Sequence, residues 1–140
     1  RKNRKSKDFL IIARLESLIL NRGMNDACKR ADAYSKSGAD LIMIHSKQKK
    51  PTEIFNFAKK FRKSKYYVPL VSVPTSYSKT YEKDLIKNGF KVVIYANHLL
   101  RASYFAMNKT LDSILKNGRS FESEKNIEKV SNLLKYSEIK

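Results

Sequence analysis

Four short apolar runs, separated by segments with helical spacing, constrain the fold of this chain more than any other feature of its sequence. The runs begin near residues 9, 41, 69 and 91 and are rich in Val, Ile or Leu without polar alternation. Continuous runs of this kind are typical of strands that are covered on both faces, as in a parallel sheet. The alternation of strand and helix therefore predicts a parallel α/β fold built from a βα repeat.

The segments between the runs carry the signals of helix ends. A helix is predicted over residues 25–37, and a second begins at Pro51, where a missing N–H is harmless. Gly38, Gly89 and Gly118 each follow a polar or basic turn, as glycines beyond a helix C-terminus do. Two further helices are expected, one after the third strand and one after the fourth.

A last amphipathic helix is expected near the C-terminus, because apolar residues there fall on one side of a helix: Ile127, Val130, Leu133 and Leu134. We treat residues 1–140 as a single partial domain, with a basic lead-in at 1–7 and a helical tail at 119–140. Four βα units fit either a small open sheet or half of a (β/α)8 barrel, which takes about 250 residues when complete. The chain opens with Arg rather than Met, so we expect a cut N-terminus.

Composition narrows the class of protein. No apolar run approaches the roughly 18 residues of a membrane span, and no signal peptide is visible, so we expect a cytoplasmic protein without a membrane partner. The single Cys28 cannot form a disulfide within the chain. The net charge of +17 suggests a nucleic-acid partner, and Tyr66 and Tyr67 follow one basic cluster. Because Lys and Arg occur on nearly every predicted helix and no nucleic-acid motif is present, we do not favour that function.

Polar residues follow each predicted strand. In parallel α/β folds, ligands bind at the carboxyl ends of the strands. Those ends read Arg14-Leu15-Glu16, His45-Ser46-Lys47, Pro74-Thr75-Ser76 and Ala96-Asn97-His98. Every strand therefore delivers polar groups, including both histidines, to one rim of the sheet.

Arg14 and His45 are the strongest candidates at this rim. Arg14 either forms a structural ion pair with Glu16 or clamps an anion, because a guanidinium donates a planar fork of N–H groups to carboxylate or phosphate. Glu16 is then expected to orient Arg14 rather than to act in catalysis. His45 is either an ordinary hydrogen-bonded rim residue or a donor to a phosphoryl oxygen or a general acid/base.

Three other rim residues rank lower. Ser46 is a weak candidate for binding substrate, Asn97 is expected to cap the following helix, and His98 is expected to be an ordinary rim residue. The sequence contains no Gly-rich phosphate loop, no zinc-like ligand spacing and no evident serine or cysteine triad.

Four segments of the chain occur in the order and spacing of one known family: "ARLES", "AYSKSGADLIMIHSK", "VPLVSVPTSY" and "VIYANHLLRAS". On these segments, over about residues 8–118, the chain resembles the C-terminal half of the phosphoenolpyruvate mutase family, of the isocitrate lyase and phosphoenolpyruvate mutase superfamily. It implies the C-terminal half of a modified (β/α)8 barrel. It also implies a dimer or tetramer whose subunits exchange their last helix.

The resemblance further implies an isomerase that interconverts phosphoenolpyruvate and phosphonopyruvate with Mg²⁺. By this resemblance, Arg14 and His45 match the positions that hold the transferring phosphoryl group. The metal ligands of the family lie in its N-terminal half, so we expect none here and expect that half as a partner. Phosphonopyruvate hydrolase, a related lyase, a non-catalytic remnant and a basic nucleic-acid-binding module are the alternatives.

Overall fold

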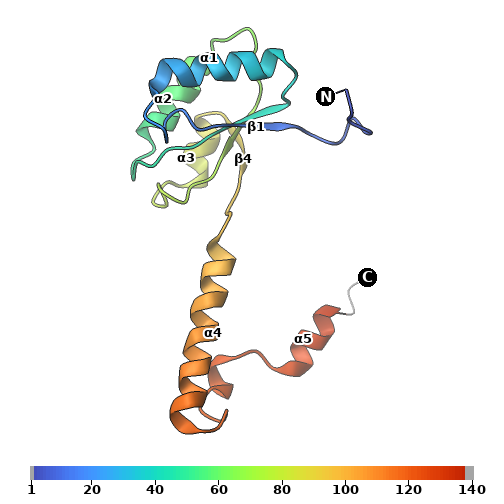
Figure 1. Cartoon of the computed structure of the whole chain (residues 1–140), viewed down its shortest axis with the longest axis vertical. Helices are drawn as coiled ribbons and strands as arrows, with labels where there is room; N and C mark the ends of the chain where they lie inside the picture. The colour runs from blue at the N-terminus through green and yellow to red at the C-terminus, as the bar shows by residue number, and fades with distance from the viewer. Residues whose placement is uncertain (1, 138–140) are drawn as a thin grey trace. The chain divides into compact units, whose positions relative to one another are not determined.

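The computed structural model describes residues 2–137, which divide into two compact units at the junction of Ala96 and Asn97. The first unit contains β1 (Ile12–Leu15), α1 (Gly23–Lys36), β2 (Leu41–Ile44), α2 (Thr52–Phe61), β3 (Leu70–Ser72), α3 (Glu82–Lys87) and β4 (Phe90–Val93). The second contains α4 (His98–Asn117), the 3-10 turn η1 (Glu124–Asn126) and α5 (Val130–Ser137). Figure 1 labels most of these elements.

The strands of the first unit form one parallel sheet in the order β1-β2-β3-β4. Each strand therefore lies beside the next one in the chain, and each connection contains a helix. This arrangement confirms the predicted βα repeat. The register of the first pair sets Ile12 opposite Leu41 and Leu15 opposite Ile44.

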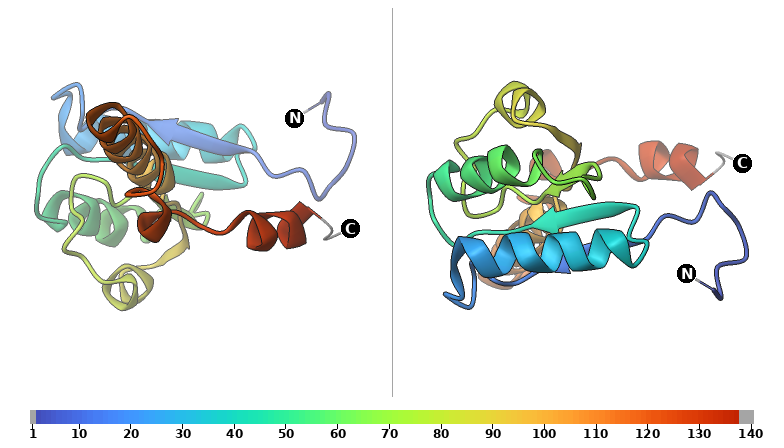
Figure 2. Two further views of the ribbon diagram at one scale, coloured as in Figure 1. Left: turned by 90° about the horizontal axis from the view of Figure 1, so that it is seen from below. Right: turned by 90° about the horizontal axis from the view of Figure 1, so that it is seen from above.

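One face of the sheet packs against the helices. In α2, Ile54, Phe57, Ala58 and Phe61 are all buried, and their spacing of three or four residues places them on one side of the helix. The buried residues of α1 are alanines, whose small side chains allow close packing. The views of Figures 1 and 2 show α1 and α2 side by side. The strands contribute buried Leu15, Ile42, Ile44, Leu70 and Phe90 to the same core.

Glycines end two helices as predicted. Gly118 follows α4 with φ of 64°, in the left-handed region, and its N–H donates to the carbonyl of Ile114. Gly89, with φ of 93°, turns the chain from α3 directly into β4. Both positions favour glycine because a Cβ is strained in this region of backbone space.

The first strand begins at Ile12, so the predicted start near residue 9 is wrong. Phe9 and Leu10 are 68% and 57% exposed, and the Phe9 N–H donates to the carbonyl of Ser6 in a turn. The physical reason is that β1 is an edge strand of the described sheet, and its partner β2 begins only at Leu41, opposite Ile12, so residues 9 and 10 have no paired strand beside them. Arg4 fixes this lead-in by donating to the Phe9 carbonyl and to Asp40.

The predicted C-terminal helix is wrong in its extent. The 3-10 turn η1 comes first, and Ile127 then has extended backbone angles, which separate the turn from α5. Ile127 therefore does not share a helix with Val130 and Leu133. The structure groups α4 with these C-terminal elements in the second compact unit.

Replacement of Phe57 by Ala should destabilise the first unit by about 3–5 kcal/mol, because it removes a fully buried ring and leaves a cavity. Phe57 also stacks on Phe61, with ring centroids 5.6 Å apart. Urea unfolding followed by circular dichroism measures the loss. The matched control is Phe9→Ala, at a site 68% exposed, which should change the free energy of unfolding far less. Equal losses in the two variants would contradict the assigned core.

Candidate functional site

Arg14, Glu16 and His45 lie on one face of the sheet at the carboxyl ends of β1 and β2. Leu15 and Ile44 pair across these strands, and both are buried in the core beneath the helices. Successive side chains of a strand point to opposite faces, so the residues on either side of Leu15 and Ile44 point away from that core. The structure therefore brings these three predicted residues together on the face that the helices do not cover.

Arg14 and Glu16 form an ion pair through the guanidinium Nε and a carboxylate oxygen. Both side chains are substantially exposed, at 50% and 41%, so the pair contributes only about 0–1 kcal/mol to stability. Its main consequence is orientation, because Glu16 engages Nε and leaves the two terminal nitrogens of Arg14 to face a ligand. The geometry thus accommodates both interpretations of Arg14, the structural pair and the anion clamp.

His45 is a partly buried neutral imidazole at neutral pH. Burial lowers its pKa below 6.5, and the positive charge of Arg14 lowers it further, while Glu16 acts in the opposite direction. The Nδ1 atom is buried and has no hydrogen-bond partner among the described residues. A neutral imidazole carries one N–H, so His45 can donate one hydrogen bond and accept another.

Tyr77 is a neighbour of His45 that the sequence analysis missed. Its ring lies 6.3 Å from the imidazole, centroid to centroid, and its side chain is fully buried. Burial raises the pKa of Tyr77 to about 12, so the hydroxyl stays protonated at neutral pH. The signal was the aromatic residue directly after Pro74-Thr75-Ser76, the segment assigned to the third strand end.

Ser46 is fully buried, and its hydroxyl is bonded to the first turn of α2 and to the loop before it. Its hydroxyl donates to a carboxylate oxygen of Glu53, 2.5 Å away, and accepts from the N–H of Gln48 at 3.0 Å. The only hydrogen of the hydroxyl is therefore already used. These contacts favour a role in holding the β2–α2 connection over the substrate contact predicted for Ser46.

The fourth predicted strand end leads into the second unit. Asn97 occupies the N-cap position of α4, but its side chain makes no capping hydrogen bond, so the predicted cap is wrong. The backbone carbonyl of Asn97 instead accepts the N–H of Arg101. Its backbone angles, φ of −133° and ψ of 7°, depart from the extended conformation typical of a side-chain cap. His98 is the first residue of α4.

A cavity of about 230 Å³ opens beside Arg14 and is rich in cationic groups. Arg22 and Arg30 line it together with Arg14 and Glu16. Arg30 is anchored by Asp26, which also accepts a hydrogen bond from the hydroxyl of Ser17 at 2.7 Å. The Ser17 and Arg30 hydrogen bonds hold the pKa of Asp26 below 3.8, so this carboxylate is ionised at neutral pH. Of the three arginines that line this hollow, two are paired with carboxylates, Arg14 with Glu16 and Arg30 with Asp26.

The described residues can be compared with the ligand sets that hold metal ions in proteins. Residues 2–137 contain no group of three His, Cys, Asp or Glu side chains placed to hold a metal ion. The carboxylate on this face, Glu16, is paired with Arg14. Mg²⁺ requires near-octahedral oxygen ligands, so we derive no step through a metal from these residues.

Comparison with known proteins identifies the family. The model of the phosphoenolpyruvate phosphomutase family matches residues 1–115. The chain belongs to the phosphoenolpyruvate phosphomutase family. It is 41% identical over 116 residues to phosphonopyruvate hydrolase of Variovorax sp. strain Pal2, covering 82% of this chain and 39% of that protein. It is 37% identical over 128 residues to phosphoenolpyruvate phosphomutase of Tetrahymena pyriformis, covering 91% and 42%.

Solved structures of this family share the fold. A crystal structure of phosphoenolpyruvate phosphomutase from Streptomyces platensis subsp. rosaceus superposes with a TM-score of 0.89 at 34% identity, over 96% of this chain and 46% of that one. Phosphonopyruvate hydrolase in complex with oxalate and Mg²⁺ gives 0.88 at 37% identity, over 96% and 47%. This chain therefore spans about half the length of its relatives and matches part of their barrel.

Among its described helices, none has the length and apolar character needed to cross a membrane.

Removing the charge of Arg14 should raise the pKa of His45, because that cation disfavours a second positive charge nearby. Glu16→Gln should lower the same pKa, since it removes the opposing charge. Both directions can be measured by following the imidazole resonances of Arg14→Gln and Glu16→Gln against pH. Lys87→Gln, on α3, is the control and should leave the titration of His45 unchanged. A His45 pKa insensitive to both rim variants would contradict the described geometry.

Proposed function

We propose that this chain is the C-terminal part of a phosphoenolpyruvate mutase, in which Arg14 and His45 hold the phosphoryl group during its transfer between oxygen and carbon. The observation that carries the proposal is the placement of these two side chains on one face, at the carboxyl ends of adjacent strands. Membership of the phosphoenolpyruvate phosphomutase family supports the choice of this reaction.

The two residues suit the electrostatics of phosphoryl transfer. A metaphosphate-like group is stabilised by fixed cations and hydrogen-bond donors rather than by covalent chemistry. Arg14 supplies a permanent charge and a planar fork of donors, which Glu16 orients. His45, held neutral by burial and by Arg14, supplies an N–H without adding a proton to the substrate.

The rest of the active site is proposed to come from the half that this chain does not span. Relatives are about twice as long, and one of them is described with bound Mg²⁺. The edges of the described sheet are β1 and β4, whose outer backbone groups are open to further strands. We propose that the missing half pairs with both edges and brings the magnesium ligands with it.

We propose a homo-oligomer, dimer or tetramer, for the complete protein. No residue of α4 is buried, yet the helix carries an apolar stripe of exposed side chains: Leu100, Tyr104, Met107, Leu111 and Leu115. Exposed stripes of this kind mark contacts with another subunit. We also propose a cytoplasmic location. A chain with one cysteine cannot form an internal disulfide, so an oxidising compartment would not stabilise it in that way.

The reaction can be tested by phosphorus NMR of phosphonopyruvate with Mg²⁺. The samples are this chain alone and this chain mixed with the N-terminal half of the Tetrahymena relative. Phosphoenolpyruvate should form only in the mixture. In that mixture Arg14→Ala should lower turnover roughly 10²–10³-fold, because it removes a transition-state contact.

Two further variants separate charge from geometry. Arg14→Lys keeps the charge and loses the planar fork, so its turnover should fall between wild type and Arg14→Ala. Lys63→Ala, an exposed cation just beyond α2, is the control and should retain activity. Normal turnover in a folded Arg14→Ala mixture would reject the phosphoryl clamp.

Phosphonopyruvate hydrolase is the second candidate, favoured by the 41% identity to the Variovorax enzyme. The same NMR experiment distinguishes the two activities, because a hydrolase releases inorganic phosphate in place of phosphoenolpyruvate. A folded mixture that forms neither product would favour a non-catalytic remnant.

The oligomer prediction can be tested in the complemented protein by light scattering. Tyr104→Glu places a charge in the apolar stripe and should lower the molar mass by dissociating subunits. Lys116→Glu makes a larger change in charge on a different side of α4 and should leave the mass unchanged. Identical masses for Tyr104→Glu and wild type would reject the stripe as the contact.

A further inference from the structure

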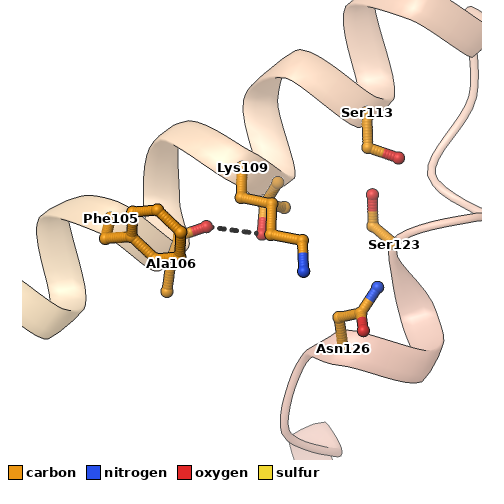
Figure 3. Close-up of a pocket in the computed structure, with 7 residues that line it drawn as sticks. Phe105, Ala106, Lys109, Ser113, Ser123 and Asn126 are labelled. Atoms are coloured by element: carbon orange, nitrogen blue, oxygen red, sulfur yellow. Dashed lines mark hydrogen bonds between the residues drawn. The ribbon is translucent and has the colours of Figure 1, made fainter.

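We propose that the second unit contains a binding site for a small oxyanion, a phosphate or a carboxylate, in the cavity between α4 and the η1 turn. The cavity has a volume of about 290 Å³ and is lined by residues of this unit alone. Figure 3 shows Lys109 and Ser113 reaching into it from α4, and Ser123 and Asn126 from the opposite wall. Nothing in the proposed mutase reaction uses these groups.

Ser123 is the observation that points to a ligand. Its side chain is only 2% exposed, and its hydroxyl oxygen has no hydrogen-bond partner among the described residues. A buried hydroxyl without a partner is unfavourable and is rare in folded proteins. Figure 3 shows this hydroxyl directed toward that of Ser113 across the cavity, where a bound oxygen could accept from both.

The other polar groups select a negatively charged ligand. Lys109 supplies a cation and Asn126 an amide, and no Asp or Glu lines the cavity. The hydroxyl of Thr110 donates to the carbonyl of Ala106, so it does not compete for the ligand. Glu122, next to Ser123, is not among the lining residues; its Oε1 pairs with Arg119 at 2.6 Å, and its buried Oε2 has no hydrogen-bond partner among the described residues. A cation and three neutral donors facing one space are the groups that recognise phosphate or carboxylate oxygens.

The charged group and the serine hydroxyl that α4 gives to the cavity lie on the side of the helix opposite the apolar stripe. Residues of a helix advance by about 100° each, so Lys109 and Ser113 lie away from the side that carries Met107 and Leu111. The stripe and the cavity adjoin at Ala106, Thr110 and Asn126, which also line a second hollow beside Met107 and Leu111. The cavity shares no residue with the rim of Arg14 and His45, because the rim residues belong to the first unit.

The site can be tested by titrating the ¹⁵N-labelled chain with inorganic phosphate at constant ionic strength and following its amide resonances. We expect saturable shifts at Lys109, Ser113, Ser123 and Asn126. Lys109→Gln should weaken this binding roughly tenfold or more, because the charged contact is lost. Ser123→Ala should weaken it to a smaller extent. A parallel titration with acetate distinguishes a general carboxylate site from one that requires phosphate.

The matched control is Lys116→Gln, which removes the same charge from α4 but does not line the cavity. Its affinity should equal that of the wild-type chain. Shifts that do not saturate, or that weaken equally in Lys109→Gln and Lys116→Gln, would show general attraction of anions to a chain of charge +17 and reject the site. Saturable shifts confined to residues around Arg14 would assign phosphate to the rim and also reject it.

Discussion

The parallel register between β1 and β2 is the constraint on which the candidate site depends. It sets Arg14 opposite Met43 and Leu15 opposite Ile44, so the apolar partners point into the core and their polar neighbours point away from it. A slip of one residue in either strand would carry its polar residues into the core. The burial of Leu15 and Ile44 therefore places Arg14 and His45 on one face of the sheet.

The strands and most helix ends could be predicted because each rests on local signals that tertiary packing reinforces. The apolar runs at β2 and β3 are buried as their composition indicates, and Gly89 and Gly118 adopt the conformations that glycine favours. The start of β1 could not be predicted, because an apolar run does not show whether other residues of the chain pack over it. Phe9 has the composition of a covered strand, but the described chain supplies no neighbour on that side.

The residues of the candidate site could be predicted where they lie at the end of a strand. Arg14, Glu16 and His45 are all within one residue of a strand terminus, so periodicity alone assigned them to the rim. Ser46 and Tyr77 depend on connections, whose course sequence patterns do not determine. The hydroxyl of Ser46 is bonded to Glu53, seven residues away, and the ring of Tyr77 reaches His45 from beyond β3. Both relationships arise only when the loops fold over the sheet.

On the proposed function, the lack of a metal-ligand set at the described rim and the open edges of the sheet have one physical origin. The described rim has cations and an N–H donor but no set of metal ligands, and the sheet has unpaired backbone groups along β1 and β4. Strand pairing at those edges would satisfy the backbone groups and cover the start of β1, including Phe9 and Leu10. Any carboxylates at the carboxyl ends of the added strands would arrive at the level of Arg14 and His45. Closure of the barrel and completion of the active site would then be the same event, stabilised by backbone pairing and apolar burial.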